Sequence, residues 1–256
     1  MCILFIALNQ HPEYPLILCA NRDEFRARKT QQMHWWSNKN LLAGKDMQAG
    51  GSWLTVTPDG DIAALTNIRE PQKADNTLRS RGELVLKVNK LSASALATDL
   101  TSNRHHYQGF NLIYSKDNAF TCFNSRQNQF IKFTDGIHSV CNGALDDEWP
   151  KMAKGKKALE SYICEQPDIN HSALLNLLKD TRQAPDELLP STGVPIDWER
   201  RLSSIFILGE EYGTRSSCIV TRDKRGKINV TEANYNANAE LVNTVEFSWL
   251  QGDRLL

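Results

Sequence analysis

The sequence predicts an α+β protein, and three observations lead to this class. Short apolar runs between turn-forming residues, which are typical of strands, recur from one end of the chain to the other. Apolar residues at helical spacing are confined to the middle. Strands that are followed by helices and then by strands again favour helices packed on antiparallel sheets.

The first two strands are expected to form a buried hairpin. Residues 2–8 and 16–20 are apolar, and the stretch between them holds two prolines among other turn-forming residues. Residues 58–60 (PDG) and 224–226 (KRG) are typical of hairpin turns. Further strands are expected at 52–57, 62–67, 110–114, 119–124, 129–133, 139–141, 204–208, 218–221, 228–231 and 245–250.

Helices are expected in three places. Residues 79–100 form one or two helices, and 149–165 and 172–181 form two more. The segment 180–199 contains three of the nine prolines and is expected to be an exposed loop. Four lysines on the helix at 149–165 are interpreted as a solvated face, the alternative being a weak contact with a membrane surface or an acidic partner. They are Lys151, Lys154, Lys156 and Lys157.

Composition is that of an ordinary globular chain, and it excludes several classes of protein. Of 256 residues 41% are hydrophobic, and 30 Lys and Arg balance 30 Asp and Glu, which argues against a nucleic-acid binder. The apolar run at the amino end is too short for a bilayer and has no basic segment before it, so we expect no secretory signal. The six cysteines lack metal-site or haem-attachment spacing, so we expect reduced thiols in the cytoplasm and no metal site.

Cys2 is the first residue that indicates chemistry. The initiator Met is usually removed when so small a residue follows, which would leave a thiol and a free α-amino group on one residue. The amine has a pKa of about 8, so part of it is unprotonated at neutral pH and can act as the base for the thiol. The alternative is that Cys2 is a small buried apolar residue at the start of a strand.

The register of the first hairpin decides which side chain lies beside this thiol. If Leu8 pairs with Pro15, Cys2 falls opposite Asn21. A slip of one or two residues places the next polar residues there instead.

Those residues are Arg22, Asp23 and Glu24, directly after the second strand. A guanidinium next to Cys2 would favour the thiolate and could hold a substrate carboxylate by its planar fork. Asp23 or Glu24 could receive the α-ammonium group. The alternative is that the polar stretch is a solvated loop.

In these residues the chain resembles the NRDE family, also called the transport and Golgi organisation protein two family. The resemblance rests on Asn-Arg-Asp-Glu after an amino-terminal Met-Cys and on further motifs that run in order over nearly the whole chain. These are residues 49–53 (AGGSW), 66–69 (TNIR), Asn142 before 149–151 (WPK), 189–193 (LPSTG) and 213–217 (GTRSS).

This resemblance implies a single domain over 1–256 with a four-layer αββα sandwich of the N-terminal nucleophile hydrolase type. It is similar to the penicillin V acylase and choloylglycine hydrolase group, in which an amino-terminal Cys is nucleophile and base. There an Arg and an Asp follow on the next strand, later Asn residues help to form the oxyanion site, and a late Arg completes the pocket. By resemblance these roles fall on Cys2, Arg22, Asp23, Asn67, Asn142 and Arg215. Those hydrolases space the early pair as Arg-x-x-Asp, whereas Arg22 and Asp23 are adjacent, so Asp23 and Glu24 both stay open as the acid.

Asn67, Asn142 and Arg215 can also be interpreted without the resemblance. Asn67 and Asn142 end expected strands, where a side-chain amide can donate to an oxyanion, and the alternative for each is an Asn that favours a turn. Arg215 follows Gly213 and could clamp an acidic group of a ligand. Its alternative is a surface ion pair with Glu210 or Glu211.

The resemblance also implies haem trafficking, with haem as the transported ligand, no cofactor required and apo-haemoproteins as acceptors. A haem pocket needs Arg or Lys for the propionates next to apolar walls. The candidate ligand-binding residues are Cys2, Arg22, His34, Trp53, Arg69 and Arg215. For His34, beside two Trp residues, the alternative is a half-buried packing role.

The sequence therefore predicts a cytoplasmic haem-trafficking protein on an N-terminal nucleophile hydrolase scaffold. The alternative is an amidohydrolase or acyltransferase that acts on non-peptide C–N bonds with Cys2 as nucleophile. A third hypothesis is an interaction protein with a relic pocket. The expected partners are a small molecule (haem or an acyl or amide compound) and apo-haemoproteins, with no nucleic acid and at most peripheral contact with a membrane.

Overall fold

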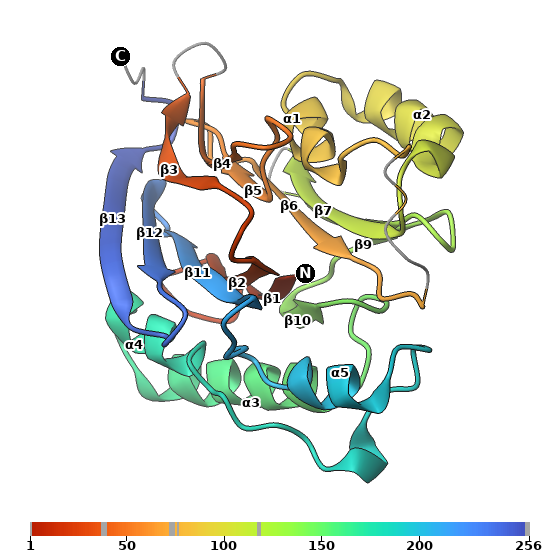
Figure 1. Ribbon diagram of the computed structural model, residues 1–256. Helices are drawn as coiled ribbons and strands as arrows, with labels where there is room; N and C mark the ends of the chain where they lie inside the picture. The colour runs from red at the N-terminus through yellow and green to blue at the C-terminus, as the bar shows by residue number, and fades with distance from the viewer. Residues whose placement is uncertain (1, 37–39, 72–74, 76, 117–118, 254–256) are drawn as a thin grey trace. The chain divides into compact units, whose positions relative to one another are not determined.

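The computed structural model describes residues 2–36, 40–71, 75, 77–116 and 119–253 (Figure 1). The chain divides into two compact units. Residues 1–27 and 134–250 make up the first unit, and residues 28–133 and 251–256 make up the second.

The first unit is built on a six-stranded antiparallel sheet in the order β10-β1-β2-β11-β12-β13. Its helical segments lie between β10 and β11 in the sequence. The strands are β1 (Cys2–Leu8), β2 (Leu16–Phe25), β10 (Gly136–Val140), β11 (Tyr212–Arg222), β12 (Lys227–Tyr235) and β13 (Leu241–Leu250). The helices are α3 (Pro150–Glu165), α4 (His171–Leu177), the 3-10 helix η3 (Asp186–Leu188) and α5 (Ile196–Arg201).

Alternation along β1 and β2 gives the sheet two different faces. Ile3 and Phe5 on β1 and Cys19 on β2 pack in one cluster with Met152 and Leu159 of α3. Successive side chains of a strand point to opposite faces, so the even-numbered residues of β1 and β2 face away from the helices. Cys2 therefore points away from α3.

Two local features fix α3 against β1. Trp149 is the N-cap and Pro150 takes the first helical position, where its missing N–H is not needed. A Cβ on Gly155 would lie 2.0 Å from Cζ of the Phe5 ring. Only glycine allows the helix to lie this close to the strand.

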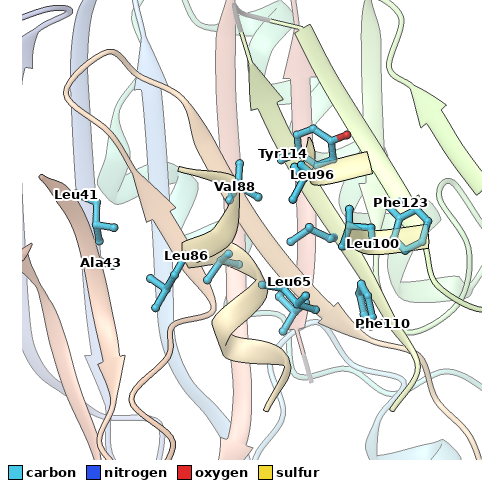
Figure 2. Packing of buried hydrophobic residues seen from close by; sticks show 14 of the residues in the cluster. Leu41, Ala43, Leu65, Leu86, Val88, Leu96, Leu100, Phe110, Tyr114 and Phe123 are labelled. Atoms are coloured by element: carbon cyan, nitrogen blue, oxygen red, sulfur yellow. The ribbon is translucent and has the colours of Figure 1, made fainter. Parts of the chain in front are cut away.

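The second unit holds a seven-stranded antiparallel sheet whose strands follow chain order from β3 to β9. Helices α1 and α2 pack on one face, where Leu86, Val88, Leu96 and Leu100 meet Phe110 and other sheet residues (Figure 2). The strands are β3 (Thr30–Trp36), β4 (Leu41–Asp46), β5 (Leu54–Val56), β6 (Ile62–Asn67), β7 (Phe110–Lys116), β8 (Ala119–Asn124) and β9 (Gln129–Lys132). The helical segments are η1 (Arg81–Glu83), α1 (Leu84–Val88), α2 (Ala93–Asn103) and η2 (Arg104–His106).

The predicted α+β class, with helices against large antiparallel sheets, is confirmed in both units. Both expected hairpin turns are present, with Gly60 and Gly226 at a φ of 81° that glycine adopts without strain. One or two helices were expected at residues 79–100, and the structure has two α-helices there, of which the second extends to Asn103.

Three expectations about secondary structure were wrong. Strands β3 and β4 were not foreseen, and η3 and α5 lie within the segment expected to be a loop. Residues 204–208 are not a strand. Ile205 and Phe206 are buried in hydrophobic clusters without belonging to a strand, which explains the apolar run in the sequence. Within this irregular segment Ser204 Oγ donates to the Phe206 carbonyl at 2.8 Å.

Among the described residues no helix has both the length and the apolar character needed to cross a bilayer. All six cysteines are free, and five of them are buried while Cys164 is exposed.

Candidate functional site

The candidate site begins with Cys2 and Arg22, which are directly opposite each other in the β1–β2 pairing. Opposed residues of an antiparallel pair carry their side chains on the same face, so the thiol and the guanidinium share one face of the sheet. Both are buried, with exposed fractions of 9% and 5%.

The expected hairpin register was wrong by one residue. Leu8 pairs with Leu16 rather than with Pro15, and this shift moves Asn21 from Cys2 to Ile3. Pro15 has no N–H to donate, and it takes part only through its carbonyl, which accepts from the Asn9 N–H at 2.9 Å. The sequence left open a slip of one or two residues, and the structure shows a slip of one, which places Arg22 opposite Cys2.

Burial dominates the electrostatics of the thiol. It raises the pKa of Cys2 to about 11, and the negative charge of Asp23 acts in the same direction while Arg22 opposes it. At neutral pH this thiol is protonated, and the positive charge of the neighbouring Arg22 favours its thiolate without outweighing burial.

Asp23 lies on the other face of β2, which is the face of the helices. Its carboxyl is 1% exposed and accepts a 2.6 Å hydrogen bond from Thr214 Oγ1. Burial raises the pKa of Asp23, and the positive charge of Lys151 and the bond from Thr214 oppose this shift. Glu24 is only half-buried and accepts from the Phe25 N–H. Of the two acids that the sequence left open, Asp23 therefore holds the buried position.

Asn21, the first residue of the motif, has a bonding role in the sheet. Its Nδ2 donates to the carbonyls of Leu178 and Ile205, both at 2.9 Å. Its Oδ1 accepts from Ser217 Oγ at 2.6 Å. The side chain thus fixes two irregular segments to β2 directly before Arg22.

Arg215 is the extra residue of a β-bulge. β11 pairs Thr214 with Asp23 and Ser216 with Arg22, so Arg215 has no partner position on β2. Bulges redirect a side chain at the place where a strand pairing is interrupted. Nη1 of Arg215 donates to the Phe25 carbonyl at 3.0 Å.

Arg26 belongs to the same group of cations, although nothing in the sequence pattern selected it. Burial lowers the pKa of Arg215, and the positive charges of Arg22 and Arg26 lower it further. Arg22 and Arg26 therefore each lie within electrostatic reach of Arg215, and the negative charge of Glu24 opposes their effect. Such a cluster favours an anionic ligand group.

Ser216 was also missed as a single residue, although it lies within the GTRSS motif. It faces Arg22 across the β2–β11 pairing, and it is 3% exposed. Its Oγ has no hydrogen-bond partner among the described residues. Because it shares the face of Cys2 and Arg22, this hydroxyl is a further candidate for ligand contact.

Asn142 is two residues beyond Val140, the β10 residue that pairs with Leu4 of β1. The chain after β10 thus continues along β1 towards Cys2. Asn142 is 2% exposed, and its Oδ1 accepts from Cys141 Sγ at 3.1 Å. The expected strand at 139–141 ends one residue earlier, at Val140, so Asn142 follows β10 after one intervening residue.

The other predicted site residues belong to the second unit. Asn67 ends β6 as expected, and Arg69 follows it, 8% exposed. His34 on β3 is half-buried, its Nδ1 contacts the Gln32 carbonyl at 2.9 Å, and its ring stacks on Trp36. This contact fits the packing alternative. Trp53 covers Gly44, where a Cβ would lie 2.2 Å from the indole ring. Their membership of the Cys2 site stays a prediction.

Fold and site together define an α+β protein with a buried thiol at the start of an inner strand, a guanidinium opposite it and a cationic cluster next to it. The sequence profile of the family Transport and Golgi organisation 2 matches residues 1–237, and the chain belongs to this family.

Relatives and solved structures give the extent of the similarity. The chain is 31% identical to the human Transport and Golgi organization protein 2 homolog over 91% of its length and 92% of that protein. It is 25% identical to the protein of that name from Drosophila melanogaster, over 91% of each chain. Among solved structures, an N-acylethanolamine-hydrolyzing acid amidase ortholog from Caenorhabditis elegans gives a TM-score of 0.47 at 13% identity, over 78% of this chain and 97% of that chain. Anbu from a Hyphomicrobium strain gives 0.35 at 10% identity, over 97% and 88%.

Proposed function

We propose that this chain is a cytoplasmic haem-trafficking protein that holds haem transiently at the Cys2 site. The observation that carries the proposal is Arg22 opposite the buried Cys2 thiol, with Arg215 close enough to Arg22 to be affected by its charge. Haem presents two propionates, which pair well with planar guanidinium groups, and an iron that accepts a thiolate as axial ligand.

Burial of Cys2 suits a carrier that must release its ligand. Because the pKa of the thiol rises from 9.0 to about 11, forming the thiolate at pH 7 costs about 3 kcal/mol more than for an ordinary thiol, at 1.36 kcal/mol for each pH unit. An iron–thiolate bond at Cys2 is weakened by this amount relative to one at an exposed thiol. A transient complex results, with the propionates contributing most of the orientation.

Haem titration of the purified protein tests the proposal. Wild-type protein should show a saturable change in the Soret region at micromolar haem. Arg22→Gln and Arg215→Gln should each weaken binding by about tenfold, in keeping with a lost charge-assisted pair. Cys2→Ala should alter the spectrum more than the affinity. Arg225→Gln, an exposed arginine in the β11–β12 turn, is the matched control and should bind as wild type. Wild-type protein without a saturable change would refute the carrier function.

A second candidate function is favoured by a different observation, the pair of Cys2 and Arg22 with Asp23 buried next to it on the other face. Removal of Met1 would place an α-amino group on Cys2, between the thiol face and the Asp23 face. In this amidohydrolase, the amine takes the thiol proton, Sγ attacks the amide carbonyl carbon, and a tetrahedral oxyanion forms near Asn142. The proton passes to the leaving amine, and water then hydrolyses the thioester to a carboxylate and the free thiol.

Intact-mass analysis separates the two functions. A chain that keeps Met1 has no free amine on Cys2, which contradicts the enzyme but not the carrier. A chain that begins at Cys2 and gains one acyl mass from an activated amide supports the enzyme. In that case Arg225→Gln should acylate normally and Cys2→Ala should not acylate.

A further inference from the structure

A cavity of about 180 Å³ lies on the helix side of the first unit. Its walls come from the start of α3, from residues 182–185 and from the segment before β11. Cys2 and Arg22 point to the opposite face of the sheet, so this cavity is separate from the site described above.

Hydrogen bonds between its walls hold the cavity open. Lys151 Nζ donates to the Leu202 carbonyl at 2.8 Å, which joins α3 to the segment before β11. The Ala184 N–H donates to Ser203 Oγ at 2.9 Å, and the Phe206 N–H donates to the Asp180 carbonyl at 2.8 Å. A ligand therefore meets a preformed shape and does not need to order a loop.

Three basic side chains line this cavity, namely Lys151, Lys154 and Arg182. Asp180 pairs with Lys154 and also accepts from Arg182 Nε at 2.9 Å and Nη2 at 2.8 Å. The Arg182 bonds hold the pKa of Asp180 well below its usual range, so this carboxylate stays charged and fixes both cations at the rim.

Lys151 does not lie on the solvated helix face that the sequence suggested, because it is only 3% exposed. Asp23 also lies within electrostatic reach of Lys151, since the charge of Lys151 lowers the pKa of that carboxyl. The three basic side chains of the cavity therefore outnumber the two carboxylates near them, Asp180 and Asp23. An anion in the cavity would restore the balance.

The remaining walls set the kind of anion. Pro150, Pro185 and Ile205 give the cavity apolar sides between the cations. Its volume is close to the roughly 150 Å³ of a cavity that is known to admit benzene. We propose that it is a second ligand site, which binds a small monocarboxylate whose apolar body has up to about six carbons, with the carboxylate at Lys154 and Arg182.

Benzoate is the probe for this site, and calorimetry is the measurement. Wild-type protein should bind one benzoate per chain, and the neutral isostere benzamide should bind at least about tenfold more weakly, because an amide forms weaker hydrogen bonds with cations than a carboxylate does. Arg182→Gln and Lys154→Gln should each weaken benzoate by about fivefold or more. Ala184→Leu, which keeps every charge and fills the cavity, should abolish binding.

Two controls identify the site. Lys157→Gln removes an exposed lysine from the same helix, outside the cavity, and should leave benzoate binding unchanged. Arg22→Gln disables the proposed haem site and should also leave benzoate binding unchanged. A failure of the haem proposal can therefore be told apart from a failure of this one. The inference is overturned if benzoate does not bind saturably, if benzamide binds equally well, or if Arg22→Gln removes binding while Arg182→Gln does not.

Discussion

Thr214 and Asp23 form a buried hydrogen bond of 2.6 Å that joins β11 to β2 one residue away from the bulge. The same hydroxyl accepts from the Ile207 N–H at 2.9 Å, and the Thr214 N–H donates to the Ile207 carbonyl at 2.9 Å. One threonine therefore fixes the acid of the candidate site and ends the irregular segment before β11.

Replacing this threonine should weaken the fold. Thr214→Val keeps the shape of the side chain but leaves the Asp23 carboxyl and the Ile207 N–H without this partner. An unsatisfied buried polar group costs about 1–3 kcal/mol, so we expect the free energy of unfolding to fall by about 2–4 kcal/mol. Urea denaturation measures it. Thr244→Val on the exposed side of β13 is the control, and an equal loss in both variants would contradict a special role for Thr214.

The contact of Gly155 with Phe5 gives a second prediction. Gly155→Ala gains about 1 kcal/mol of helix propensity. The added methyl group would meet the Phe5 ring at 2.0 Å, and overpacking of a tight core costs about 1–3 kcal/mol. The net change should be destabilising, and Phe5→Leu in the same chain should recover part of it. Thermal unfolding of the single and double variants measures these changes in stability. A Gly155→Ala protein more stable than wild type would show that the helix can move away from Phe5.

Much of the fold followed from buried apolar runs. β1 and β6 begin and end at the expected residues because such runs between turn residues have few alternatives. β3 was missed because it is an edge strand whose second and third residues are the exposed Gln31 and Gln32, and so it lacks this pattern. Residues 204–208 show the opposite error, since a buried irregular segment is as apolar as a strand.

The site was predictable only in part, for reasons of register. Sequence spacing brought Cys2 near Arg22 within a slip of one or two residues, and the structure selected one of those pairings. The bulge at Arg215 depends on how β11 pairs with β2, which no local pattern encodes. Lys151 lies three residues before the half-exposed Lys154 on the same helix, and its burial depends on the segment that covers the start of α3.

His171 should make the stability of the protein sensitive to acid. Its two ring nitrogens contact Thr231 Oγ1 at 2.8 Å and Thr221 Oγ1 at 2.9 Å, and burial lowers its pKa to about 4. The unfolded chain, with a pKa of about 6.5, binds the proton first. The stabilisation is therefore complete above pH 6.5, declines as the pH falls towards 4, and changes no further below that.

The size of this effect is at most about 3 kcal/mol, from 1.36 kcal/mol for each pH unit between the two pKa values. Urea unfolding at pH 7 and pH 4.5 should show that wild type loses more stability than His171→Gln, which does not titrate. His106→Gln, an exposed histidine, should lose as much as wild type. An identical loss in wild type and His171→Gln would exclude a buried neutral imidazole.

The last prediction concerns the reactivity of Cys2, on which both proposed functions depend. In the chain that keeps Met1, a pKa of about 11 leaves about one thiol in a thousand ionised at pH 8, and the side chain is buried. Iodoacetamide should therefore label the exposed Cys164 well before Cys2, as peptide mass mapping can follow.

A chain that begins at Cys2 should behave differently if the enzyme function holds, because the α-amine can then take the thiol proton. Its labelling at Cys2 should rise with pH around the pKa of the amine, near 8, and Arg22→Gln should slow it by removing the charge that favours the thiolate. Cys164 in the same samples is the internal reference. Cys2 labelling as fast as that of Cys164 in the chain with Met1 would show that the thiol is open to solvent, and it would contradict the buried thiol on which the transient haem complex is argued.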